Sequence, residues 1–173
     1  RDFIEADKNQ DDLGYFPLRQ AISTLVAQDY QFTLPVEHLM ITSGGHQAIF
    51  LIVQALLNSG DAVAICQPSF LYALNLFQTA GIRLYGVPMD DQGMRLDLLE
   101  TEILKHRVKL VMLNPTFQNP TGTTMSLARR KALIKLCQTY KIPIIEDDAF
   151  GLLPFDKRQN LTKKKKLDPQ NVI

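Results

Sequence analysis

The chain has 173 residues, 46% of them hydrophobic and 21% charged, which is typical of a globular domain with one sizeable core. Its 19 Lys and Arg residues oppose 18 Asp and Glu residues, so a net charge of +1 gives no overall field that would recruit nucleic acid or an anionic membrane. No apolar run approaches the roughly 18 residues of a membrane span. The sequence therefore predicts one folded unit, residues 1–173, in a soluble cytoplasmic protein without membrane contact.

Both ends of the chain predict a longer parent protein. The chain begins at Arg1 without an initiator Met or a charged and apolar leader. It finishes on Asn171-Val172-Ile173, which has the character of the opening of a buried strand.

The two cysteines lie in apolar stretches. Cys66 stands in AVAICQP and Cys137 in LIKLCQTY, and the two do not form a CxxC pair. This pattern predicts buried thiols in a reducing compartment and disfavours a disulfide.

Alternating segments in chain order predict an α/β fold. Leu18, Ile22, Leu25 and Val26 recur at helical spacing, so an amphipathic helix is expected from Pro17 to about Tyr30. The predicted strands that follow are 39–42, 62–66, 84–87, 109–113 and 142–145, and the predicted helices are 45–58, 70–80, 95–106 and 126–140. Runs such as LVML and IPII are apolar at successive positions, as in strands covered on both faces, so we expect a mostly parallel sheet flanked by helices.

Ligands of open α/β sheets bind at the carboxyl ends of the strands, so the loops there are candidate sites. Ser43-Gly44-Gly45 follows a predicted strand and opens a predicted helix, where backbone N–H groups and the positive end of the helix dipole suit a phosphate. Glycines also serve any tight turn from strand to helix, so both interpretations stay open. The segment matches neither GxGxxG nor GxxxxGK[ST], which argues against the two familiar nucleotide loops.

Two further residues stand just beyond predicted strands. Phe70, in Gln67-Pro68-Ser69-Phe70, is either a flat apolar surface at the rim of the same site or a core aromatic. Asn119 precedes Pro120, a junction that restricts the backbone of Asn119 and can aim its side-chain amide, although a plain turn is the alternative.

Glu146-Asp147-Asp148 places carboxylates at the end of an apolar strand. Charges of one sign this close repel, so at least one carboxylate is expected to have a cationic partner. A metal site and a helix cap are the alternatives, and metal is disfavoured because His38, His46 and His106 show no ligand spacing with one another or with the cysteines. The Lys163–Lys166 run is expected to be a solvated loop, with a phosphate or nucleic-acid contact as the alternative.

Taken in this order, TSGGHQA, QPSF, NPTG and IIEDDAF resemble the large domain of fold-type I enzymes that depend on pyridoxal 5'-phosphate (PLP), the aminotransferase class I and II superfamily. The resemblance covers essentially the whole chain. PTFQNPTG with the following MSLARR and EDD looks most like aminoadipate/kynurenine-like aminotransferases and the aminotransferase-like domains of GntR/MocR regulators. It implies PLP as cofactor, an amino acid and a 2-oxo acid as substrates, and a homodimer. Residues 1–173 would be the N-terminal part of the PLP-binding large domain, without the small C-terminal domain.

The resemblance assigns five cofactor-binding residues. The backbone at Gly45 and His46 would hold the phosphate, and Phe70 would stack on the pyridine ring. Asn119 would hydrogen-bond the ring oxygen, and Asp147 would pair with the ring nitrogen and keep it protonated.

This chain departs from the family pattern in three respects. The family usually has Ser or Ala at the position of Gly45 and Gln at that of His46, so any side-chain bond to phosphate is in doubt while backbone contacts survive. Ala149 and Phe150 stand where many members have a tyrosine that contacts the ring oxygen. The lysine that binds the cofactor covalently, and the arginine that binds the substrate carboxylate, are expected beyond Ile173, so the chain alone is expected not to transaminate.

Three functions remain open on the sequence. The leading one is an aminotransferase. The second is the effector domain of a GntR/MocR-type regulator, which would contact DNA only through a winged-helix domain upstream of Arg1. The third is an α/β binding module without PLP.

Overall fold

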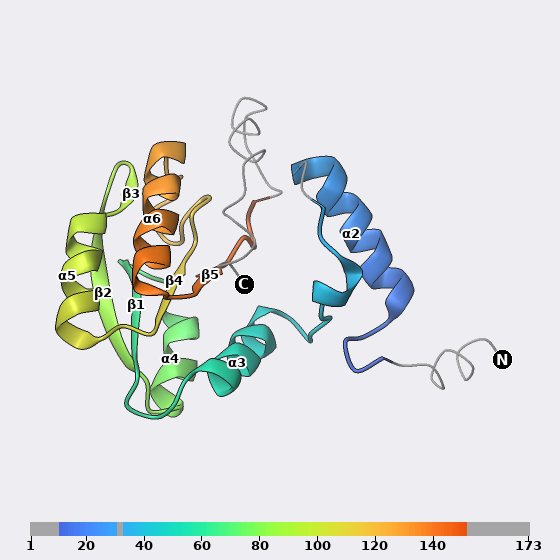
Figure 1. The fold of residues 1–173 in the computed structure, drawn as a ribbon, viewed down its shortest axis with the longest axis horizontal. Coiled ribbons are helices and arrows are strands. Elements are labelled where there is room, and N and C mark those ends of the chain that lie inside the picture. The colour runs from blue at the N-terminus through green and yellow to red at the C-terminus, as the bar shows by residue number, and fades with distance from the viewer. Residues whose placement is uncertain (1–10, 31–32, 152–173) are drawn as a thin grey trace.

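The computed structural model describes residues 11–30 and 33–151 of the chain. Its elements, labelled in Figure 1, are α2 (Phe16–Tyr30), η1 (Val36–His38), α3 (Gly45–Leu56), β1 (Ala62–Gln67), α4 (Leu71–Thr79), β2 (Arg83–Asp90), β3 (Gly93–Met94), α5 (Leu96–His106), β4 (Leu110–Leu113), α6 (Leu127–Tyr140) and β5 (Ile144–Glu146).

The strands form one sheet in the order β3-β2-β1-β4-β5. β1 pairs in parallel with β2 on one side and with β4 on the other, and β4 pairs in parallel with β5. The register places Ala64 between Tyr85 and Val111. The prediction of a mostly parallel sheet flanked by helices is confirmed, and the exception is the antiparallel pairing of β3 with β2.

Each face of the sheet carries its own apolar core. Ala62, Ala64 and Cys66 of β1 point into a core with α5 and α6, to which Leu99 and Leu133 belong. Val63 and Ile65, the alternate residues of β1, point into the core with α3 and α4, to which Ile49, Val53 and Phe77 belong. In Figure 1 α5 and α6 are drawn towards the upper left and α3 and α4 below them. This double burial explains why the central strands are apolar at successive positions.

Cys66 and Cys137 are both buried and free, as predicted. Each lies in the core under α5 and α6. Burial raises the pKa of each thiol to about 12, because the charged thiolate would lose its hydration there.

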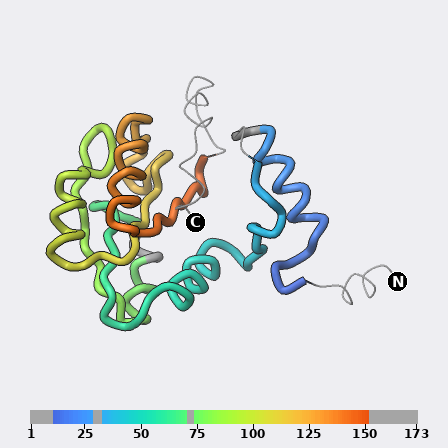
Figure 2. Tube along the Cα trace, viewed as in Figure 1, coloured from blue at the N-terminus to red at the C-terminus, as the bar shows by residue number. Residues whose placement is uncertain are grey.

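Helix α2 stands apart from the sheet, at the blue end of the trace in Figure 2. Arg19, only 2% exposed, ties it to its surroundings by donating to the carbonyl oxygens of Gly14 (3.1 Å) and Val36 (3.2 Å) and pairing with Asp11. The predicted helix is confirmed, yet Leu18 and Leu25 of its apolar stripe are exposed. The bounds of α2 therefore follow the sequence pattern, but no part of the described residues fully covers its apolar stripe.

The predicted strand at 39–42 is wrong. Leu39 is extended, with φ −110° and ψ 128°, but the segment lies between η1 and α3, outside the sheet. The amide of Ile41 donates to the carbonyl oxygen of Leu13 (2.9 Å), so the segment is held by a bond to the turn before α2 rather than by a ladder. An apolar run becomes a strand only where a neighbouring strand satisfies its backbone groups.

None of the helices within the described part of the chain combines the length and the apolar character required to cross a bilayer. The expected strand opening at Asn171–Ile173 and the Lys163–Lys166 run both lie outside the described residues.

Candidate active site

The carboxyl ends of β1, β4 and β5 lie side by side, because β4 sits between the other two parallel strands. The segments that leave these ends are 68–70, 114–124 and 147–151. Phe70, Asn119 and Asp147, which were predicted separately from the sequence, are therefore brought to one edge of the sheet.

Asp147 follows β5 directly and is anchored to β4 by its main chain. Its amide donates to the carbonyl oxygen of Leu113 (3.0 Å), and its own carbonyl oxygen accepts a hydrogen bond from Asn114 Nδ2 (3.2 Å). The half-buried side chain is oriented as well, since its Oδ1 atom accepts from the amide of Ala149 (3.1 Å). These bonds fix the main chain that carries the Asp147 carboxylate at the carboxyl end of the sheet.

Phe70 and Asn119 stand on loops that a buried glutamine joins. Gln118 Nε2 donates to the carbonyl oxygen of Pro68 (2.8 Å) and to that of Asn119 (2.8 Å). Phe70 lies just before α4 with 42% of its surface exposed, so the interpretation as a core aromatic is wrong, and its place at the rim of the site stays a prediction. The peptide bonds Gln67-Pro68 and Asn119-Pro120 are both cis.

Gly45 and His46 begin α3, in the layer of helices that covers the sheet, and both are exposed. Gly44 precedes them with φ 99° and supplies no side-chain cap. The amides of the first helical turn have no acceptor within their own helix, and a Cβ added at Gly45 would meet no atom within 4 Å. The start of α3 is therefore open to an anion. It is held relative to the strands by packing of Ile49 and Val53 in the core.

A buried arginine supplies the cationic partner expected for the acidic triplet. Arg130 NH1 lies 3.8 Å from Glu146 Oε1, and the side chains are each 6% exposed. Arg130 also donates to the carbonyl oxygens of Pro115 (2.8 Å) and Met125 (3.1 Å) and to Thr116 Oγ1 (2.8 Å). Burial lowers the pKa of Arg130, and the charges of Glu146 and Asp148 oppose that shift.

Sequence reasoning missed both Gln118 and Arg130 as parts of this edge. Arg130 carried a signal, because it lies three and seven residues before Leu133 and Cys137 and so shares the buried stripe of α6. A charged residue on such a stripe indicates a buried partner. Gln118 lies in a loop, where no periodicity marks burial.

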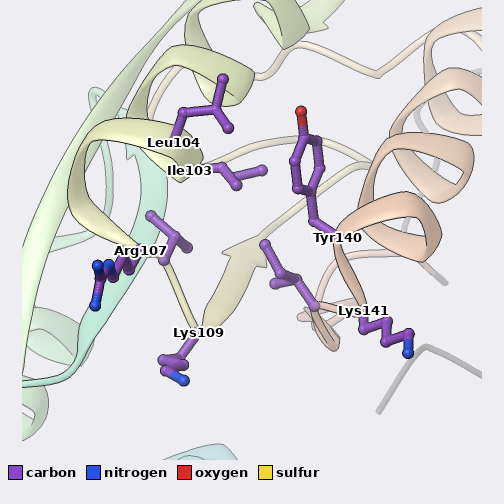
Figure 3. A pocket seen from close by; sticks show the side chains of 8 residues that line it. Ile103, Leu104, Arg107, Lys109, Tyr140 and Lys141 are labelled. Carbon is purple, nitrogen blue, oxygen red and sulfur yellow. The ribbon is translucent and has the colours of Figure 1, made fainter.

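A pocket of about 320 Å³ lies at the opposite edge of the sheet (Figure 3). Its lining includes Lys109, just before β4, and Ile142, just before β5, so it borders the amino ends of the strands. Arg107 and Lys141, the C-cap residues that follow α5 and α6, direct their charged groups outward in Figure 3. These cations complement the negative ends of the two helix dipoles. The pocket is thus separate from the strand ends that carry the candidate site.

Comparison with known proteins identifies the family to which the chain belongs. The family model for aminotransferase class I and II matches residues 6–168. Aromatic-amino-acid aminotransferase 1 of Thermococcus litoralis is 37% identical over 82% of this chain and 35% of its own length. An uncharacterized HTH-type transcriptional regulator of Bacillus subtilis, YdfD, is 36% identical over 89% of this chain and 32% of its own length.

A solved structure shows the same fold. The kynurenine aminotransferase of Pyrococcus horikoshii, crystallised in complex with PMP, superimposes with a TM-score of 0.73 at 33% identity, over 84% of this chain and 37% of that one. The chain spans about a third of the length of the curated relatives named above. With the family model covering nearly all of its residues, the chain belongs to the aminotransferase class I and II family.

Proposed function

We propose that this chain forms one side of the PLP site of an aminotransferase, whose complete protein exchanges an amino group between an amino acid and a 2-oxo acid. The observation that carries the proposal is the gathering of Phe70, Asn119 and Asp147 at the carboxyl ends of β1, β4 and β5. PLP when bound supplies an electron-withdrawing ring that makes bonds at the substrate Cα easier to break.

The donors and acceptors at these strand ends and at the start of α3 fit the groups of PLP. The open start of α3 at Gly45 and His46 offers backbone amides to the phosphate. Phe70 offers an exposed aromatic face to the ring, and the amide of Asn119 offers a donor to the ring oxygen. The Asp147 carboxylate would hold a proton on the ring nitrogen, because an adjacent negative charge favours the protonated form. Phe150 supplies no phenol to this edge.

The covalent attachment and the substrate carboxylate site are proposed to come from sequence outside residues 1–173. The lysines of the described residues are Lys105, Lys109, Lys131, Lys135 and Lys141, and each is exposed on α5, on α6 or at the amino ends of the strands. By the same proposal, residues 1–173 alone do not transaminate, and a second subunit of a homodimer completes the site.

A second function is favoured by the regulator among the relatives. The 36% identity to an HTH-type transcriptional regulator covers 89% of this chain. A PLP-binding effector domain of a GntR/MocR-type regulator is therefore the alternative. Phe150 in place of a tyrosine is consistent with a site that binds the cofactor or its amino-acid adduct with less demand for turnover.

The first test is the visible absorbance of the full-length protein purified with PLP, before and after borohydride reduction. We expect a cofactor band that reduction fixes to the protein. Asp147→Asn should weaken PLP binding by about tenfold, the effect of losing a charge partner worth about one pKa unit or more. Asp12→Asn, an exposed residue in the turn before α2, is the matched control. A folded protein with no band, or equal affinity in both variants, would contradict the PLP proposal.

Turnover separates the two functions. Release of 2-oxo acid from amino acids by the PLP-loaded protein would support the enzyme. PLP binding without turnover, together with DNA binding that responds to an added amino acid, would support the regulator.

A further inference from the structure

Gln118 is a polar side chain held by hydrogen bonds at both ends of its amide. It is 1% exposed, and its amide nitrogen donates to the carbonyl oxygens of Pro68 and Asn119, each at 2.8 Å. Its Oε1 atom accepts from the amide of Thr121 (3.0 Å) and from Thr121 Oγ1 (2.6 Å). A buried amide with both ends satisfied holds its neighbours tightly, since breaking any of these bonds leaves a buried group without a partner.

The partners determine which way the amide points. The backbone amide of Thr121 can only donate, so it requires Oε1 opposite it. The carbonyl oxygens of Pro68 and Asn119 can only accept, so they require the NH2 group. The two orientations of the amide are therefore not equivalent, and only one satisfies every partner.

The Gln118 side chain joins the loops after β1 and β4 at a point beyond the last pair of hydrogen-bonded strand residues. The ladder between β1 and β4 pairs Val63–Ile65 with Leu110–Met112 and ends there. Pro68 and Asn119 lie beyond that last pair, and the Gln118 amide bridges them. Pro68 stands two residues before Phe70, so the bridge ties the residue that offers the aromatic face to the residue that offers the amide.

The bridge is distinct from the support of the local turn. The amide of Gln118 donates to the carbonyl oxygen of Thr123 (2.9 Å), and the carbonyl oxygen of Gln118 accepts from the amide of Gly122 (2.6 Å). These two backbone bonds do not involve the side chain of residue 118. Changing the side chain therefore removes the tie to Pro68 and the bonds from Thr121, and leaves both partners of each backbone bond in place.

We propose that Gln118 is a positioning residue that sets the separation between Phe70 and Asn119, and thereby the fit of this edge to the ring of PLP. The inference rests on the proposed function and extends it to a residue with no expected contact to the cofactor.

The test uses the full-length protein in three forms: wild type, Gln118→Met and Gln118→Glu. Met matches the length of Gln and fills its buried space without donors, so both carbonyl oxygens lose the amide. Glu keeps the shape but turns a carboxylate toward the same oxygens, and regains one donor only when protonated. Gln54→Met, at an exposed position on α3, is the matched control. The readouts are PLP affinity by titration, the circular dichroism of the bound cofactor, and the thermal midpoint of the apoprotein.

We expect Gln118→Met to weaken PLP binding by about tenfold and to change the circular dichroism of the bound cofactor. The reason is that Phe70 and Asn119 would be displaced, and each would lose part of its contact with the cofactor ring. For Gln118→Glu the deficit relative to wild type should shrink as the pH falls and the carboxyl becomes protonated. A purely structural role would lower the thermal midpoint and leave the dichroism and this pH profile as in wild type, which would overturn the inference.

Three further outcomes are distinguishable. If both Gln118 variants fail to fold, Gln118→Asn decides: it keeps a buried amide on a side chain one methylene shorter, which cannot reach the carbonyl oxygen of Pro68 from the same backbone, and unchanged PLP affinity and dichroism there would overturn the inference. If the wild type binds PLP and Asn119→Ala weakens binding while the Gln118 variants do not, the inference fails and the proposed function stands. If the folded wild type binds no PLP, the proposed function fails and the inference fails with it.

Discussion

Asn114 Nδ2 donates a hydrogen bond of 3.2 Å to the carbonyl oxygen of Asp147, so the first residue after β4 holds the first residue after β5. The amide on the other side of Asp147 donates to Leu113 (3.0 Å). Both peptide groups around the carboxylate are therefore tied to one neighbouring strand. The position of the carboxylate depends on β4 as much as on β5.

Asn114→Asp should disturb this tie more than Asn114→Leu. Leu removes the donor, whereas Asp places a negative oxygen against the carbonyl oxygen of Asp147. We expect a loss of about 1 kcal/mol in the free energy of unfolding for Leu and a larger loss for Asp. Urea unfolding measures both, with Asn75→Asp on the exposed side of α4 as control. Equal stability of all three variants and the wild type would contradict the role of Asn114.

Removal of Arg130 should be costly, because Glu146 would remain buried without its cationic partner. For Arg130→Met we expect the free energy of unfolding to fall by about 3 kcal/mol. Lys131→Met, which changes the exposed neighbour on α6, controls for the loss of a positive charge. A loss below about 1 kcal/mol, the size of an exposed ion pair, would show that the pair contributes little.

Because two thiols are buried, we expect the free energy of unfolding to fall at alkaline pH. The pKa of Cys66 and of Cys137 is raised from 9.0 to about 12 by burial. Below pH 9 both states keep the proton, and between 9 and 12 only the unfolded state releases it, so the stability contributed by burial is lost as the pH rises through that window. The loss approaches about 1.4 kcal/mol per pH unit for each thiol.

Comparison with Cys137→Ala isolates the thiol from other groups that titrate in alkali. The slope of unfolding free energy against pH above 9 should be shallower in the variant than in the wild type. Parallel slopes would mean that the thiol of Cys137 ionises equally in the folded and unfolded protein.

Asp90 predicts a loss of stability in acid. Arg129 NH2 lies 2.9 Å from Asp90 Oδ2, and this hydrogen bond is the main cause that lowers the pKa of Asp90 from 3.8. A lowered carboxyl pKa stabilises the fold above the unfolded value and loses that effect as the pH falls through the folded value. Below pH 4 the free energy of unfolding should therefore fall more steeply with falling pH for the wild type than for Asp90→Asn. Equal slopes would show that the ionisation of Asp90 does not contribute to stability.

Periodicity predicted most of the fold because burial in this chain is regular. The predicted helix at 126–140 is observed as Leu127–Tyr140, and the predicted strand at 62–66 as Ala62–Gln67. The pattern failed at 39–42, where apolar residues have no neighbouring strand. It also missed the antiparallel pairing of β3, a contact of two residues that is too short to produce a period.

Some residues of the candidate site could be chosen from the sequence for a similar reason. Phe70, Asn119 and Asp147 lie in the segments that leave β1, β4 and β5, and strand ends can be located from sequence. Gln118 and Arg130 act through burial and through partners distant in sequence, such as Pro68 and Glu146. Tertiary packing brings these partners together, and a single sequence does not show which distant residues will meet.

The pairing of β1 with β4 has a consequence for synthesis on the ribosome. Ala64 meets Val111 at the centre of the sheet, so this pairing cannot form until the chain has been made past residue 111. Until then the apolar residues of β1 can pair only with β2, and one side of β1 keeps unpaired backbone groups. While β2, β3 and α5 are synthesised, β1 therefore has an unpaired edge to which another chain can bind. Slow translation of residues 90–110 would prolong this state and favour aggregation.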